Sequence, residues 1–314
     1  MQEIAIGIDI GGTNTVFGII DKLGNVIFEN KLSTTGHVTL QSYINDLCSL
    51  IKEEISKLDI EYILQGIGIG APNANFYKGT IEHAANLDWK GVLPFTDMIN
   101  EHFDVPVYIT NDANAAALGE KIYGGAKDMN DFIFITLGTG LGSGLFANGK
   151  LIYGHDGFAG ELGHINAIPN GRLCGCGKKG CLETYVSATG IVNTAIEFLE
   201  KSEKGSLLKD FDKITSKDIY DAAVKGDTLA LEIFDFTAYI LGVALADAVA
   251  ILSPEAIFLF GGLANSGDYI LQPTKEYMEE NLLQVFKNKI DIKLSELDDG
   301  YAAILGASAL VFAN

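Results

Sequence analysis

The chain has 314 residues, of which 48% are apolar and 20% charged, a composition typical of a folded globular protein. This length predicts two domains. The net charge is −19, and a surface this acidic repels phosphate backbones and anionic lipids. We therefore expect neither nucleic acid nor a membrane as a partner.

The N-terminal residues enter a strand pattern at once, without a basic region or a cleavage site, so we expect no secretion and a cytoplasmic location. One apolar stretch, 234–254, needs comparison with a membrane span. Asp235 and Asp247 interrupt it and no basic residues flank it, so its uninterrupted apolar run is shorter than a span needs. A buried helix of an α/β core is the favoured interpretation.

The first thirty residues predict three strands, IAIGIDI, TVFGIID and VIFENKL, separated by the turns GGTN and KLGN. The range 39–58 has apolar residues at helical spacing and includes Cys48, which we expect to be a small core residue. Strands follow in ILQGIGIGAP and VPVYIT, and a helix begins at Asp112.

The opening pattern recurs about 128 residues later, as FIFITL, LGSGLF and KLIYG with the turns GTG and ANG. This recurrence predicts a duplicated domain. AIFLFGG predicts a further strand and AAILGASALVF a closing helix. The other helices of the second half are expected over 187–203, 217–225, 227–252 and 268–287.

The segment 161–183, ELGHINAIPNGRLCGCGKKGCLE, contains three of the four cysteines. Together with one histidine they make the Cys3His set typical of a closed structural zinc site. In a chain without a signal sequence, metal binding is favoured over the alternative of a disulfide or redox role. The expected zinc ligands are His164, Cys174, Cys176 and Cys181.

The same segment contains Glu161 and Glu183, whose carboxylates can accept hydrogen bonds from a polyhydroxylated ligand. Because the metal ligands lie between the two carboxylates along the chain, a metal here would hold a small-molecule pocket in shape.

A strand that ends in DIGGTN is suited to phosphate binding, because Gly11 and Gly12 let backbone N–H groups approach phosphate oxygens. Thr13 and Asn14 add side-chain donors, and Asp9 is suited to hold Mg²⁺ through water. A strand follows the turn, unlike the Rossmann pattern, and the chain has no GK[ST] of a Walker loop.

An ordinary hairpin is the alternative interpretation of one such turn. The second copy in GTG and a third glycine cluster in FLFGGLANSG, 258–267, favour a nucleotide bound between two domains.

Taken together, these motifs resemble the ROK family of sugar kinases, in the form found in bacterial glucokinases. LGTGLGSGLFANGKLIYGHDGFAGELGH, 137–164, matches the family signature along its whole length, and DIGGTN and CGCGKKGCLE also match. The resemblance covers essentially the whole chain. It implies an α/β protein of the actin-like sugar kinase ATPase fold, with two RNase H-like domains and the active site in the cleft between them.

The expected first domain covers 1–120, together with a C-terminal helix at about 301–314 that packs back on it. The second covers 121–300 and includes the zinc site and much of the nucleotide site. The family also implies a homo-oligomer, a dimer or a tetramer.

The resemblance implies that Asp112 is the catalytic base. Its position where a strand meets a helix N-terminus fits that role, and fits a plain N-cap equally well. The matched sugar-binding positions are Asn86, Asn111, Asp112, Glu161, His164 and Glu183. The matched ATP-contacting positions are Gly11, Gly12, Thr13, Gly138, Thr139, Gly140, Gly261 and Gly262, beside Asp9 and Asn14.

His164 would have two functions: one ring nitrogen binds zinc and the other hydrogen-bonds the sugar, which fixes the orientation of the ring. The zinc would be structural, because four protein ligands leave no open coordination position.

The predicted function is ATP-dependent phosphorylation of a hexose at its 6-hydroxyl, most simply glucose, with ATP, Mg²⁺ and Zn²⁺ as cofactors. The alternatives are a kinase for N-acetylglucosamine, N-acetylmannosamine, mannose or fructose, and a sugar-sensing transcriptional regulator. A regulator would need a winged helix-turn-helix before the first glycine turn, where Asp9 leaves no room. A non-catalytic protein of the actin class explains neither the carboxylates nor the cysteines.

Overall fold

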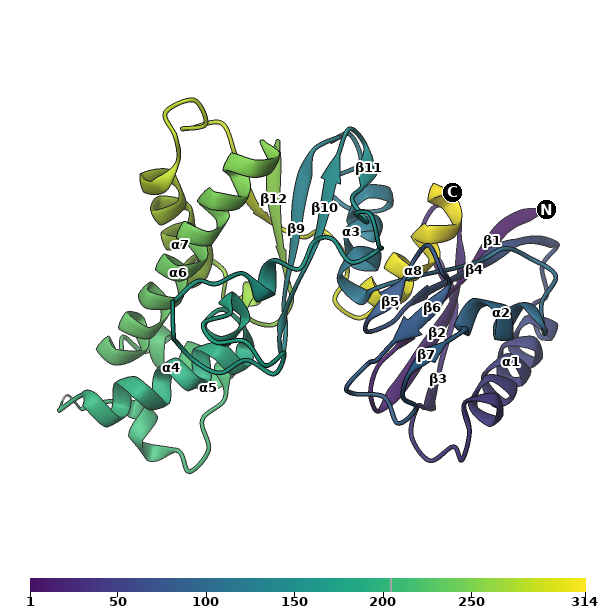
Figure 1. Cartoon of the computed structure of the whole chain (residues 1–314), viewed down its shortest axis with the longest axis horizontal. Helices are drawn as coiled ribbons and strands as arrows, with labels where there is room; N and C mark the ends of the chain where they lie inside the picture. Colours follow the sequence, from purple (N-terminus) through teal and green to yellow (C-terminus); the bar gives the residue numbers. More distant parts are fainter. Residues whose placement is uncertain (204) are drawn as a thin grey trace. The chain divides into compact units, whose positions relative to one another are not determined.

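The computed structural model describes residues 1–203 and 205–314. The chain divides into two compact units, whose helices and strands are labelled in Figure 1. Unit 1 comprises Met1–Met129, Leu151–Ala159 and Glu296–Asn314, and unit 2 comprises Asn130–Lys150 and Gly160–Ser295.

Unit 1 is built on a five-stranded sheet of order β3-β2-β1-β4-β8. The pairs β1–β2 and β2–β3 are antiparallel hairpins, whereas β1–β4 and β4–β8 are parallel. The strands are β1 (Gln2–Ile10), β2 (Asn14–Asp21), β3 (Val26–Ser33), β4 (Tyr62–Gly70) and β8 (Val107–Thr110). The helices are α1 (Leu40–Ser56), α2 (Phe95–Asn100), α3 (Asp112–Ile122) and α8 (Ala302–Ala313).

Unit 2 repeats this plan with the order β11-β10-β9-β12-β13, in which β10 is antiparallel to β9 and β12 is parallel to both β9 and β13. The strands are β9 (Phe132–Leu137), β10 (Leu141–Ala147), β11 (Lys150–Leu151), β12 (Ala256–Phe260) and β13 (Asp291–Leu294). The helices are α4 (Ala188–Lys201), α5 (Ser216–Val224), α6 (Thr228–Leu252) and α7 (Asp268–Asn281), with the 3-10 turns η1 (Leu162–His164), η2 (Leu182–Thr184), η3 (Leu207–Asp210) and η4 (Ala264–Ser266). The recurrence in the sequence therefore corresponds to two sheets of the same order.

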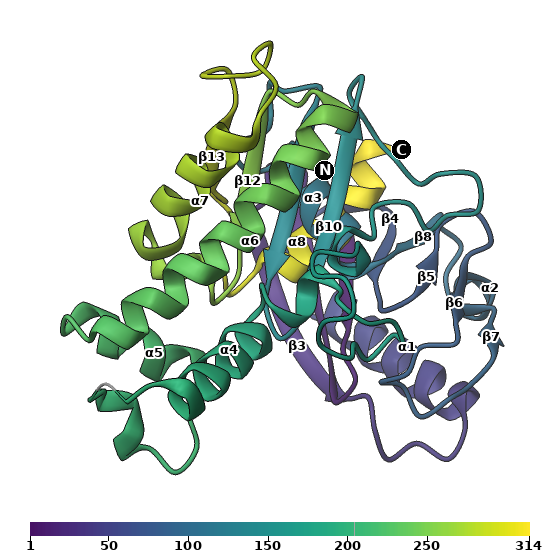
Figure 2. The ribbon, with the colours of Figure 1, turned by 60° about the vertical axis from the view of Figure 1, so that its left-hand side comes forward.

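Within the described residues, α6 is the one helix long and apolar enough to cross a membrane by length and composition alone. However, 67% of its most apolar window is buried inside the structure. Figure 2 shows α6 running beside α4, α5 and α7. It is a core helix of unit 2, as the sequence predicted.

The expected helix 268–287 is too long, because α7 ends at Asn281. Leu282 adopts an extended backbone, with φ −69° and ψ 144°, and buries its side chain, while Leu283 and Val285 remain exposed. The helix therefore ends where the backbone becomes extended at Leu282. Strand β13 and the small sheet of β5 (Ala74–Asn75), β6 (Thr80–Glu82) and β7 (Val92–Leu93) were not predicted.

The segment Leu151–Ala159 lies in unit 1, although the expected second domain included it. The ring of Tyr153 stacks on Phe76 with the centroids 4.1 Å apart. The Tyr77 hydroxyl donates to the Gly154 carbonyl at 3.0 Å, and the Asn75 amide donates to the Asp156 carbonyl at 2.8 Å. These contacts tie the segment to the hairpin of β5 and β6.

Two glycines on neighbouring strands of unit 1 leave room for α8. Gly7 of β1 and Gly68 of β4 are paired in register. A Cβ atom on Gly7 would lie 2.0 Å from the Ile304 carbonyl oxygen, and one on Gly68 would lie 1.8 Å from the Ala307 carbonyl oxygen. The helix backbone therefore approaches the sheet more closely than any other residue would allow.

We predict that Gly68→Ala lowers the free energy of unfolding by about 2–3 kcal/mol, because the added methyl group forces α8 away from the sheet. Denaturant unfolding followed by the fluorescence of Trp89, which lies in the same unit, measures this. Gly205→Ala is the control, since no atom of the described residues beyond its chain neighbours lies within 4 Å of its added Cβ. Equal stability of the two variants would contradict the close packing of α8.

Candidate functional site

Asp9 and Asp112 come together in unit 1 at the carboxyl ends of β1 and β8, the two strands on either side of β4. Asp9 is near the end of β1, and Asp112 begins α3 directly after β8. Between them β4 ends at Gly70, whose absent Cβ would lie 3.8 Å from Asp9 Oδ1 and 3.9 Å from Asp112 Cα. The parallel sheet therefore brings together two acidic residues that are far apart in the sequence.

Both carboxyl groups are harder to ionise than usual. Burial, and then the charge of Asp112, raise the pKa of Asp9 to about 6. Burial also raises the pKa of Asp112, against the lowering effect of the Ala113 N–H. Asp112 is nevertheless exposed to solvent. We interpret the raised pKa as the effect of the protein atoms packed around a carboxyl group that a small ligand can still reach.

Asn111, rather than Asp112, is the N-cap of α3. Its side-chain oxygen accepts the Asn114 N–H at 2.7 Å, while Asp112 Oδ1 accepts the N–H of the next residue, Ala113, at 2.9 Å. The plain N-cap interpretation of Asp112 is therefore wrong. Its carboxylate lies in the first turn of the helix, where the N–H groups and the helix dipole favour negative charge.

The DIGGTN turn lies against the segment that contains Asn86. The Gly11 N–H donates to the Asn14 carbonyl at 3.0 Å and closes the turn. A Cβ on Gly12 would lie 2.7 Å from the Asn86 carbonyl oxygen. Thr13, Asn14 and Asn86 are exposed, so their side chains are available to a ligand.

In unit 2 the second and third glycine clusters lie side by side because their strands are neighbours. Gly138–Gly140 link β9 to β10, and Gly261 and Gly262 follow β12. Gly261 has φ +100°, and the Leu263 N–H donates to the Leu137 carbonyl at 3.1 Å. Thr139 is exposed at the tip of the turn.

Glu183 lies against the second glycine cluster. The Leu141 N–H donates to Glu183 Oε2 at 3.1 Å. A Cβ on Gly140 would lie 2.2 Å from the same oxygen. Gly140 therefore leaves the space that Glu183 occupies, in addition to any contact with a nucleotide.

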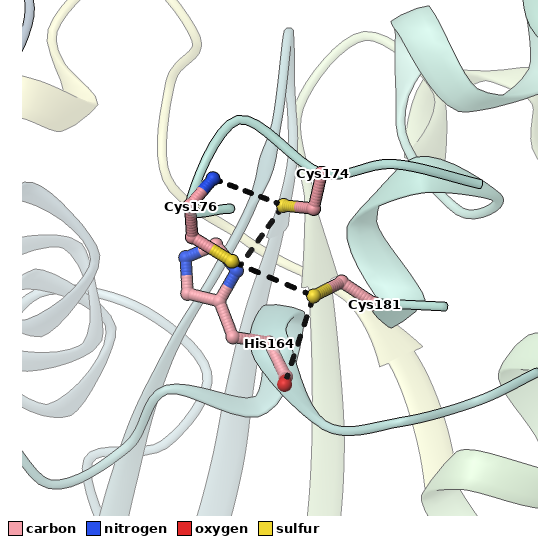
Figure 3. A group of neighbouring side chains, drawn as sticks. All are labelled: His164, Cys174, Cys176 and Cys181. Carbon is pink, nitrogen blue, oxygen red and sulfur yellow. Dashed lines mark hydrogen bonds between the residues drawn. The ribbon is translucent and has the colours of Figure 1, made fainter. Parts of the chain in front are cut away.

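The four expected metal ligands converge in unit 2, as Figure 3 shows. Their ligand atoms all lie within 4.8 Å of one another, with Cys176 Sγ and Cys181 Sγ 3.6 Å apart and Cys174 Sγ 3.7 Å from His164 Nδ1. A tetrahedral zinc ion with bonds of about 2.0–2.3 Å places its ligand atoms about 3.5–3.8 Å apart. The residues present therefore fit a structural zinc ion.

The two nitrogens of His164 face different groups. Nδ1 faces Cys174, whereas Nε2 lies 3.8 Å from Glu161 Oε2. The His164 carbonyl accepts a hydrogen bond from Lys178 Nζ at 2.8 Å. The imidazole can therefore bind a metal through Nδ1 and present Nε2 to a ligand beside Glu161.

Arg172 is a part of this region that the sequence analysis missed, although it is the only arginine in the chain. Its Nε donates to Glu197 at 2.7 Å and its Nη1 donates to the Thr184 carbonyl at 2.7 Å, while the guanidinium lies over the Tyr185 ring at 4.4 Å. Arg172 thus fixes the residues that directly follow Glu183. The signal in the sequence was that a chain of net charge −19 has a single arginine, next to the expected metal ligands.

The expected site residues fall into two groups. In unit 1 the structure brings together the DIGGTN turn, Asn86 and the pair Asp9 and Asp112, with Asn111 as the cap beside them. In unit 2 it brings together the other two glycine clusters, Glu183 and the cysteine cluster with His164 and Glu161.

The sequence profile of the ROK family matches residues 5–314. The chain belongs to the ROK family. The glucokinase of Halalkalibacterium halodurans is 37% identical over 98% of this chain and 94% of the relative, and that of Thermotoga maritima is 32% identical over 98% and 96%. The xylose repressor of Caldicellulosiruptor bescii is 30% identical over 98% of this chain and 78% of the repressor.

A solved ROK family glucokinase from Streptomyces griseus, in complex with glucose and AMPPNP, is 33% identical with a TM-score of 0.80 and covers 99% of this chain and 100% of that one. A ROK transcriptional regulator homologous to the Escherichia coli MLC protein is 27% identical with a TM-score of 0.87, over all of this chain and 78% of that one. This chain has the two-domain, actin-like sugar kinase fold, and the expected fold class is confirmed.

The raised pKa of Asp9 predicts a pH-dependent stability. The pKa of Asp9 is near 3.8 in the unfolded chain and about 6 in the folded protein, so ionising Asp9 costs more in the folded protein. The stability of the protonated form is fully present below pH 3.8 and is lost as the pH rises through about 6. Without added nucleotide or magnesium, we expect Asp9→Asn to be more stable than the parent by about 1–2 kcal/mol at pH 7.5, after allowance for solvent screening. This difference should disappear near pH 4.

Unfolding of both proteins across pH 4–8 measures this difference, with the exposed Asp59→Asn as the control. A pH-independent difference, or a variant that is less stable at pH 7.5, would contradict the electrostatic account of the pair.

Proposed function

We propose that this protein is an ATP-dependent hexose kinase that transfers the γ-phosphoryl group to the 6-hydroxyl of glucose. Two observations support this proposal. The chain is 32–37% identical to glucokinases over almost its whole length, and Asp112 is exposed at the start of α3, just after β8. The proposed reaction uses residues from both units.

Asp112 is proposed as the catalytic base. A carboxylate in the first turn of α3 can accept a hydrogen bond from the sugar 6-hydroxyl, orient it, and take its proton as the phosphoryl group moves in line. The raised pKa of Asp112 makes it a better proton acceptor than an ordinary surface aspartate.

The sugar is proposed to bind to Asn86, Asn111, Glu161, His164 and Glu183. Carboxylates accept hydrogen bonds from ring hydroxyls, while amides and the His164 ring can donate to them. Glu161 lies next to His164 Nε2, so a carboxylate and an imidazole can contact adjacent hydroxyls of one ring.

ATP is proposed to bind at the glycine turns, next to Gly11 and Gly262. The proposed backbone donors are the N–H groups of Gly12, Gly138, Gly140 and Gly261, and the proposed side-chain donors are Thr13, Asn14 and Thr139. Asp9 is the proposed site for Mg²⁺, held through water. The repulsion between Asp9 and Asp112 favours a cation there, and Mg²⁺ when bound would neutralise phosphate charge.

The proposed zinc ion is structural. His164, Cys174, Cys176 and Cys181 would complete its tetrahedral coordination and leave no position for a substrate. By fixing His164 it would also fix the ring nitrogen that faces the sugar. The cytoplasmic location and the homo-oligomer stay predictions.

A sugar-sensing regulator is the second candidate, favoured by the similarity to the ROK regulator with a TM-score of 0.87. A sensor would bind glucose without releasing ADP. A kinase for another hexose would release ADP with mannose, fructose, N-acetylglucosamine or N-acetylmannosamine rather than with glucose.

We expect a coupled ADP-release assay with Mg-ATP to give activity with glucose above that with mannose, fructose, N-acetylglucosamine and N-acetylmannosamine. Asp112→Asn should lower kcat about 10²–10⁴-fold, because the base is lost, while glucose binding changes little. The exposed Asp59→Asn serves as the control. Full activity of Asp112→Asn would contradict the assignment of the base, and activity with another sugar alone would contradict the preference for glucose.

We expect one zinc ion per chain by metal analysis, and a loss of most of it in Cys176→Ser, since the tetrahedral set is then incomplete. The KM for glucose should rise at least tenfold, because His164 is no longer fixed. Cys48→Ala, which removes the buried thiol of unit 1, should keep its zinc. Normal glucose kinetics in a zinc-free Cys176→Ser would show that the metal does not shape the sugar site.

A further inference from the structure

Ser143 lies in β10 and is almost completely buried, with 2% of its surface exposed. Its hydroxyl donates to the Gly160 carbonyl and accepts the Leu162 N–H at 3.2 Å. These two peptide groups lie directly before and directly after Glu161. One side chain therefore holds the backbone on both sides of a proposed sugar-binding carboxylate.

The backbone at Glu161 needs such support because no regular strand or helix holds it. Gly160 has φ +93°, in the region that favours glycine, and Glu161 precedes the short turn η1 with φ −86° and ψ 52°. Its cap position has no side-chain hydrogen bond within η1. The Ser143 hydroxyl supplies the hydrogen bonds that repetitive structure would otherwise supply.

The same strand also holds the second carboxylate. Leu141 lies two residues before Ser143 in β10. The Leu141 N–H binds Glu183 Oε2 at 3.1 Å, and a Cβ on Gly163 would lie 2.2 Å from the Leu141 carbonyl oxygen. The stretch Leu141–Ser143 therefore contacts Glu183, η1 and both peptide groups beside Glu161.

We propose that Ser143 is a positioning residue for sugar recognition, which sets the place of Glu161 relative to Glu183 from the common strand β10. The sugar role of both carboxylates rests on the proposed function. The link between Ser143 and the backbone at Glu161 rests on the hydrogen bonds alone. Ser143 does not belong to the Cys3His cluster, so its effect is separable from that of zinc.

Ser143→Ala removes both hydrogen bonds and keeps the remaining shape of the side chain. We expect the KM for glucose to rise about tenfold or more, with the KM for ATP within twofold of the parent value and zinc unchanged. Thr237→Val is the matched control: Thr237 is also buried in unit 2, but its hydroxyl donates to the Ile233 carbonyl of its own helix. It should leave both KM values unchanged.

Amide hydrogen exchange of a peptide that includes Leu162 gives a second measurement that does not depend on activity. Exchange should be faster in Ser143→Ala and unchanged in Thr237→Val. If Ser143→Ala does not fold, Ser143→Cys replaces it, since its thiol is a weaker hydrogen-bonding group of similar shape, and a smaller change in the same direction is expected.

An unchanged KM for glucose in an active variant, or equal rises in the KM for glucose and for ATP, would overturn the positioning role. Unchanged exchange at Leu162 would overturn the link itself. If the parent protein phosphorylates no hexose, the proposed function fails, while the exchange experiment still decides the role of Ser143 at Glu161.

Discussion

Contacts that only a glycine permits place the polar groups of this protein. Gly140 leaves space for the Glu183 carboxylate, and Gly12 for the backbone of Asn86. Each of these glycines lies at or just beyond the end of a strand. The close approach of turn and side chain therefore depends on the missing Cβ, and the arrangement of the site depends on that approach.

Electrostatic repulsion is the second constraint. The charge of Asp112 raises the cost of ionising Asp9, in a chain whose net charge is already −19. A bound cation would relieve this cost, which connects the stability of unit 1 with its proposed magnesium site. In unit 2 the guanidinium of Arg172, which donates to Glu197 and to the Thr184 carbonyl, supplies the positive charge beside the residues that follow Glu183.

The sequence predicted the parts of the fold whose signal is local. The duplicated strand and glycine-turn pattern, the length of α6 and the Cys3His set all follow from residues close together in the chain. The sequence did not predict the two-residue strands β5 and β7, the end of α7 at Asn281, or the place of Leu151–Ala159 in unit 1. These features depend on contacts between distant residues, such as the stacking of Tyr153 on Phe76.

The candidate site shows the same division. The family motifs identified the carboxylates, the metal ligands and the glycine turns. The supporting contacts of Ser143 and Arg172 could not be predicted, because a serine in a strand has no pattern that shows which peptide groups its hydroxyl will meet.

The most direct test of the central claim is a competition experiment followed by phosphorus NMR. The protein is incubated with Mg-ATP and equal amounts of glucose, mannose, fructose, N-acetylglucosamine and N-acetylmannosamine. The account predicts that a hexose 6-phosphate derived from glucose accumulates first, together with an equal amount of ADP. Accumulation of a different sugar phosphate, or of ADP with inorganic phosphate and no phosphomonoester, would contradict it.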